Sequence, residues 1–201
     1  MSLPYESASS GSAAMTDRPI IFSAPMILAL LEGRKTMTRR LAWTEGKPKT
    51  IRGRANTGFR RASSWQKVSP GDRLFVREAI TWNPEDGTLF YTADQAPLAA
   101  MPPAGYEIAR AHISSVFMPR WASRLTLTVT ATRIERLQNI TEEDAKAEGV
   151  LPPGNPGNAW PHFALIWTDL HGPGSWGANP EVVAISFTVE KRNIDREASA
   201  K

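Results

Sequence analysis

The chain has 201 residues, no cysteine and a formal net charge of +4, and 41% of its residues are hydrophobic. This composition indicates one globular domain with its own core, and it excludes disulfide bonds, thiolate zinc sites and a cysteine nucleophile. No apolar run approaches the roughly 18 residues of a membrane-spanning helix, and no signal-peptide pattern opens the chain. A cytoplasmic protein without a membrane partner is therefore expected.

The first 16 residues are small, polar and aperiodic, which predicts a disordered leader or a tag. One domain is expected over residues 17–192, beginning with a short strand. Ser23 then caps a helix that runs to residue 32 and ends at Gly33. Residues 44–70, rich in glycine, serine, proline and cations, predict a long basic loop, and residues 193–201 predict a frayed tail.

The middle and end of the chain alternate between strand and helix patterns. Apolar residues alternate over 73–77 and most clearly over 124–137, which predicts two strands. Thr141 caps a short helix that ends at Gly149, with Asp144 completing a capping box. A second helix over 161–170 and a last strand over 181–191 follow. This order predicts an α+β fold, a small antiparallel β-barrel with a few short flanking helices.

Residues 34–40 carry four cations and two hydroxyls in seven positions. If they form a strand, Lys35 and Arg39 share one face, and Thr36, Thr38 and Arg40 share the other. A hydroxyl and a guanidinium two residues apart suit a phosphate or a nucleobase, and a lysine with a lowered pKa can act as a base. The alternative is a solvated edge strand whose cations block aggregation.

Two further positions allow two interpretations each. Trp121 lies between Arg120 and Arg124, so it is either a base-stacking ring or a plug at one end of the barrel. Glu148 ends its helix, where the dipole disfavours a carboxylate unless a cation is near, but Glu32 ends its helix in the same way. The histidines lack metal-ligand spacing, so neither a metal nor a cofactor is expected.

The segments "GRKTMTRR", "PGDRLFVRE" and "ITEEDAKAEG" together resemble the ASCH domain, a branch of the PUA-like superfamily of small β-barrels. "RPIIFSAPMILALLEGRKTMTRR", "MPRWASRLTL" and "GPGSWGANP" are similar to ASCH-like proteins of phages and prophages, often labelled morphogenetic proteins. The resemblance extends from Arg18 to Arg192. It implies a pseudo-barrel with a cleft between the first helix, the Lys35 segment and the barrel mouth.

The first functional hypothesis is a module that binds RNA or a modified nucleotide in this basic cleft, as the resemblance implies for PUA-like relatives. The binding side chains would be cations, hydroxyls and one ring: Arg34, Thr36, Arg39, Arg40, Arg73, Arg77, Arg120, Trp121 and Arg124. Salt-sensitive binding is the expected signature of such a surface.

The second hypothesis is an enzyme. One bacterial ASCH group removes the acetyl group from N-acetylated cytidine with a lysine, a threonine three residues later and a glutamate near the end of the helix after the long strand. The resemblance places these roles on Lys35, Thr38 and Glu148, without a metal. A metal-dependent ribonuclease, reported for another ASCH protein, ranks lower. The third hypothesis is phage assembly through an apolar surface around Trp160 and Trp176.

Overall fold

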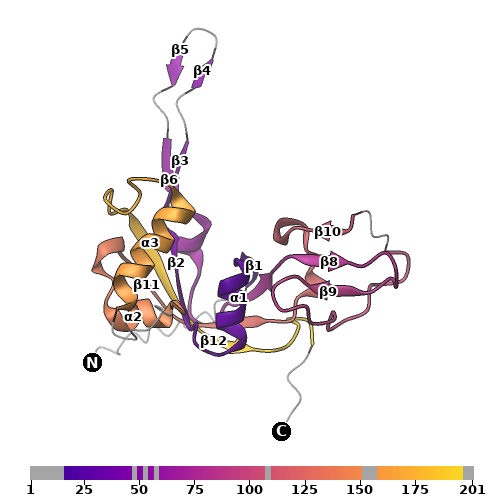
Figure 1. The fold of residues 1–201 in the computed structure, drawn as a ribbon. Helices are drawn as coiled ribbons and strands as arrows, with labels where there is room; N and C mark the ends of the chain where they lie inside the picture. The colour runs from indigo at the N-terminus through magenta and orange to yellow at the C-terminus, as the bar shows by residue number, and fades with distance from the viewer. Residues whose placement is uncertain are drawn as a thin grey trace, which may run out of the picture.

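The computed structural model describes residues 16–46, 49–51, 54–56, 59–106, 110–150 and 158–196, with the backbone alone for 49–51 and 54–56. Its architecture is α+β, with α1 (Ala24–Leu31), α2 (Glu142–Ala147) and α3 (Ala159–His171) set around a main sheet and smaller strand pairs (Figure 1). The expected leader falls almost wholly on residues 1–15, outside the described part.

The main sheet is open and mixed. Its order is β1 (Asp17–Ile21), β7 (Arg73–Arg77), β11 (Thr126–Arg136), β12 (Glu181–Glu190) and β2 (Met37–Leu41). β1 and β7 pair in parallel, and the other neighbours are antiparallel. Among the described residues no pairing joins β1 to β2, so the sheet does not close into the expected small barrel, and the parallel β1–β7 pair departs from the expected antiparallel arrangement. The chain between β1 and β7 is a long crossover, which a parallel pair requires and local patterns do not reveal.

The segment expected as a basic loop contains paired strands. β3 (Trp43–Gly46) pairs with β6 (Phe59–Ala62), and β4 (Lys49–Ile51) pairs with β5 (Arg54–Asn56) to form an arm that projects from the sheet in Figure 1. The Arg60 guanidinium lies 4.3 Å from the Trp43 ring centroid. Such cation–π contacts stabilise the β3–β6 pair. Its sequence has little alternation of apolar residues, so the strands were not predicted. The 3-10 turn η1 (Ser64–Lys67) follows.

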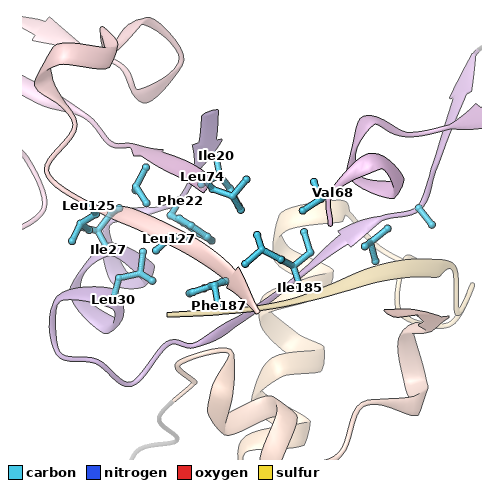
Figure 2. Close-up of a cluster of buried hydrophobic side chains, with 14 residues drawn as sticks. Ile20, Phe22, Ile27, Leu30, Val68, Leu74, Leu125, Leu127, Ile185 and Phe187 are labelled. Atoms are coloured by element: carbon cyan, nitrogen blue, oxygen red, sulfur yellow. The ribbon is translucent and has the colours of Figure 1, made fainter. Parts of the chain in front are cut away.

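The principal core lies between α1 and the main sheet (Figure 2). Ile27 and Leu30 of α1 are fully buried in the same cluster as Leu74 of β7 and Leu127 of β11. Full burial of such a side chain contributes about 1.5–3 kcal/mol, so this layer supplies much of the stability. Leu74 and Leu127 lie on the apolar faces that the alternation predicted. A separate three-stranded sheet, β10 (His112–Ile113), β8 (Ile80–Trp82) and β9 (Leu89–Tyr91), covers a third cluster that includes Ile80 and Tyr91.

The two later helices pack together over a second cluster that includes Phe163 and Trp167. α3 begins earlier than the predicted residue 161, because the Glu142 carboxylate accepts hydrogen bonds from the backbone N–H groups of Ala159 (2.7 Å) and Trp160 (3.0 Å). These contacts supply the N-terminal cap of α3 from a neighbouring helix. Trp167 is buried, but Trp160 lies edge-to-face on Trp176 and is 39% exposed.

The first residues of the expected frayed tail are anchored. The Asn193 amide donates hydrogen bonds to the carbonyl groups of Arg120, Trp121 and Ser123, and Ile194 is buried. Polar sequence at the end of a strand predicts fraying, but here one side chain satisfies three carbonyls of a distant turn. Residues 197–201 lie outside the described part.

Candidate functional site: two helix ends and a pocket

The candidate site is built where the C-terminal ends of α1 and α2 meet. α1 ends just before Gly33 (φ 75°), where the chain turns back toward the helix. The Lys35 N–H then donates a hydrogen bond to the carbonyl of Ala29 at 3.0 Å. α2 stops at Gly149 (φ 82°), and Glu148 just before it forms an isolated antiparallel bridge with Lys35. Left-handed glycines are the usual helix stops, so two standard endings bring residues 113 positions apart into register.

The Lys35 amine is held by three acceptors. It donates to the Met37 carbonyl (2.9 Å), the Glu148 carbonyl (2.9 Å) and the Glu148 carboxylate (2.8 Å). Lys35 is 2% exposed and Glu148 3% exposed. Burial lowers the pKa of Lys35, although the neighbouring Glu148 carboxylate opposes that shift. An ammonium group has three donors, so the amine is fully satisfied in its charged form.

Glu148 also binds Arg39, whose side chain is completely buried. The guanidinium of Arg39 donates to Glu148 (3.2 Å), Glu135 (2.8 Å) and Asp144 (2.5 Å). Arg133 pairs with the latter two carboxylates from the outer side. Three cations thus balance three carboxylates, which makes a buried charge network of this kind tolerable. Arg39, predicted to meet phosphate, is therefore neutralised from within the protein.

A pocket of about 250 Å³ opens beside this network. Lys35, Thr38 and Glu148 all line it, as do the rings of Phe22 and Trp167. Thr38 is 4% exposed, and its hydroxyl has no hydrogen-bond partner in the described part of the chain. The three side chains to which the resemblance assigned catalysis thus share one pocket, and the Thr38 hydroxyl is the member still able to bond a ligand.

Arg40 differs from the other cations of this region. Its guanidinium donates to the Ile21 carbonyl at 2.6 Å and lies 5.2 Å from the Phe22 ring centroid and 5.4 Å from that of Trp65. Within the described residues no carboxylate lies within ion-pair distance of it. Burial lowers the pKa of Arg40, opposed by the charge of Glu148. A cation stacked on rings without an acid partner is available to an anionic ligand.

The remaining predicted arginines have partners elsewhere, and none lines this pocket. Arg73 and Arg120 share the carboxylate of Asp17. Arg124 is held by Glu78 and Asp94. The other two donate to backbone carbonyls: Arg77 to those of Val116 and Met118, and Arg34 to that of Gly149 at 2.7 Å in addition to its ion pair with Glu32.

The last two predicted binding residues also lie outside the pocket. Thr36 is exposed and does not line it. Trp121 packs on the cluster covered by the β10–β8–β9 sheet. The ring of Tyr106 lies edge-to-face against the ring of Trp121, with the ring centroids 5.2 Å apart. Trp121 is half-buried, so part of its ring surface is occupied by side chains of the protein itself.

The sequence did not point to the α3 side of the pocket. Trp167 and His171 both line it, and their rings stack at 4.0 Å. They are four residues apart on one helix, and this spacing places their side chains on the same face. The spacing is the feature of the sequence from which their common position could have been predicted. In the described residues no group of three His, Asp or Glu side chains is arranged to hold a metal, and no helix there has the length and apolarity to cross a bilayer.

No protein-family model and no curated protein matches the chain. Among solved structures, it is similar to the crystal structure of protein EF3133 from Enterococcus faecalis V583, which is assigned to the family model DUF984. The two chains are 14% identical, the match covers 93% of this chain and 88% of that chain, and the TM-score is 0.41. A similarity at this level carries no argument about function.

Proposed function

We propose that the chain is a nucleotide-binding domain of the ASCH, PUA-like type, and that the pocket beside Lys35 receives one base or nucleoside of an RNA or of a free modified nucleotide. The observation that carries this proposal is the meeting of three kinds of group in one pocket: the Thr38 hydroxyl, the Arg40 guanidinium and aromatic rings. Among the described residues the hydroxyl has no hydrogen-bond partner and the guanidinium has no carboxylate partner. Nucleotides present the matching groups, namely polar base edges, the flat face of the base and phosphate.

The size of the pocket limits its occupant. Pockets for drug-sized ligands enclose about 300–1,000 Å³. The volume here, about 250 Å³, suits one base or nucleoside and not a folded oligonucleotide. An RNA would therefore have to present a single unstacked nucleotide, as enzymes and readers of single bases require.

Thr38→Val is expected to weaken nucleoside binding about tenfold or more, because it removes the hydroxyl but keeps the shape of the side chain. Calorimetric titration at low salt with cytidine, N-acetylcytidine, uridine, adenosine and guanosine measures this. Thr36→Val, two residues away and outside the pocket, is the matched control and should bind as the unmodified protein does. Absence of binding by every one of these nucleosides, or equal affinity in both variants, would contradict the proposal.

Amidohydrolysis of an acylated cytosine is the second candidate, favoured by the unbonded Thr38 hydroxyl in the same pocket as a lysine of lowered pKa. Lys35 would take a proton from Thr38 or from water, and the oxygen so activated would form a bond to the acetyl carbon. The bond between that carbon and the cytosine nitrogen would then break, and the nitrogen would take the proton back from Lys35 as cytidine leaves. If water attacks, acetate is released directly, and if Thr38 attacks, a water then hydrolyses the acetylated threonine to acetate. It ranks second because the Lys35 amine already has three acceptors and must lose a proton first.

Turnover of N-acetylcytidine, followed by cytidine release, should rise as the pH rises through the pKa of Lys35, because the neutral amine is the active base. Burial moves that rise below the pH expected of an ordinary lysine. Turnover that survives in Lys35→Ala would rule out this mechanism. The assembly role of Trp160 and Trp176 stays a prediction of the sequence.

A further inference from the structure

A second pocket, of about 370 Å³, adjoins the first. Arg40 and His171 line both pockets, so these two side chains stand at their junction. The second pocket is completed by two rings, Trp43 and Trp65, and by hydroxyl groups at the base of the β3–β6 arm, among them that of Ser64. Two pockets that share a cation are the arrangement expected for consecutive bases with a phosphate between them.

Among the cations that line the two pockets, Arg40 differs in having no acidic partner in the described part of the chain. Lys35 and Arg39 are neutralised by buried carboxylates, whereas Arg40 has none within ion-pair distance among the described residues. Glu45 also lines the second pocket, but it is exposed and forms no ion pair with a described residue. An anion at Arg40 would thus contact a positive charge that no described carboxylate neutralises. The rings of Phe22 and Trp65 partly shield this charge from water.

We infer that the ligand is a nucleotide strand of at least two residues, with its phosphodiester held at Arg40 and its second base in the pocket of Trp43 and Trp65. This inference rests on the proposed function, because it takes the first base to lie in the pocket beside Lys35. It narrows the substrate class from an RNA or a free modified nucleotide to a single-stranded nucleic acid. Aromatic rings accept any base by stacking, so the second pocket adds affinity more than sequence preference.

The test compares nucleosides with the corresponding dinucleoside monophosphates, in ribose and deoxyribose forms, by calorimetric titration of the full chain. The dinucleotide is expected to bind at least about tenfold more tightly than the nucleoside, the effect of one charge-assisted hydrogen bond together with base stacking. Arg40→Gln should remove this advantage, so that the variant binds the dinucleotide no more tightly than it binds the nucleoside. Arg110→Gln, an exposed arginine that lines neither pocket, controls for net charge and should change neither affinity.

Ser64→Trp is a second variant that places bulk in the second pocket from an exposed position and leaves the first pocket untouched. It should abolish the dinucleotide advantage even if Arg40→Gln fails to fold. Equal affinities of dinucleotide and nucleoside for the unmodified protein would overturn the inference and leave the proposed function standing. No binding of either probe would overturn both, and a preference for one sugar would identify RNA or DNA as the source of the strand.

Discussion

Replacing Glu148 by glutamine is expected to lower the free energy of unfolding by about 3–5 kcal/mol, the usual loss when one partner of a buried ion pair is removed. The Glu148 carboxylate binds both the Lys35 amine and the Arg39 guanidinium, and all three side chains are nearly inaccessible to water. Glutamine keeps the shape but not the charge, so two buried cations would lose a shared counter-ion. Urea unfolding followed by tryptophan fluorescence measures the difference.

Glu32→Gln is the matched control for that change. Glu32 and Glu148 each precede a left-handed glycine at the end of a helix, but Glu32 is exposed and pairs only with Arg34 among the described residues. An exposed pair contributes about 0–1 kcal/mol, so its loss should be small. Equal losses in the two variants would show that Glu148 makes no more than an ordinary surface contact.

Gly149→Ala is expected to cost about 2–5 kcal/mol, as the sum of two penalties. A left-handed backbone costs a residue with a Cβ about 1–2 kcal/mol, and Gly149 has φ 82°. The added Cβ would also lie 2.8 Å from the Cβ of Ala29 and 2.9 Å from that of Lys35, and such overpacking costs about 1–3 kcal/mol. The small size of glycine therefore allows α1 and the Lys35 segment to approach the end of α2.

Gly33→Ala separates the two penalties. Gly33 has φ 75°, but in the described part of the chain no atom beyond its two chain neighbours lies within 4 Å of the position that its Cβ would occupy. It should lose only the backbone share, about 1–2 kcal/mol. The difference between the two variants in urea unfolding then measures the contact between the helix ends, and no difference would mean that they do not touch there.

Local features of the fold were predictable because each depends on neighbouring residues. Gly33 stops α1 near the expected residue, and the Thr141 hydroxyl accepts a hydrogen bond from the Asp144 N–H at 3.1 Å, as the capping pattern predicted. The other hydrogen bond of a capping box, from the Thr141 N–H to the Asp144 carboxylate, is not among those of the described residues. The Asp144 carboxylate pairs with Arg39 and Arg133 instead. The capping pattern thus assigned the Asp144 carboxylate to the start of its own helix, whereas in the structure it forms charge-assisted hydrogen bonds with arginines of other elements.

Long-range features were not predictable. The sequence suggested that a set of arginines would bind phosphate, but each of them contacts carboxylates or carbonyl groups of the protein, most of them far along the chain. Arg73 meets Asp17 56 residues away, and Arg39 meets Asp144 105 residues away. No local pattern tells which carboxylate will reach a given arginine. The dipole argument for Glu148 required only a nearby cation, and the structure supplies Lys35 and Arg39.

The most direct test of the account is a ¹H–¹⁵N NMR titration of the full chain with the ribonucleosides and their dinucleotides. The account predicts shift changes centred on the backbone amides of Phe22, Thr38, Arg40 and His171, which line the pocket beside Lys35. Shift changes confined to the β8–β9–β10 sheet, or absent at millimolar ligand, would contradict the claim that this pocket receives a nucleoside.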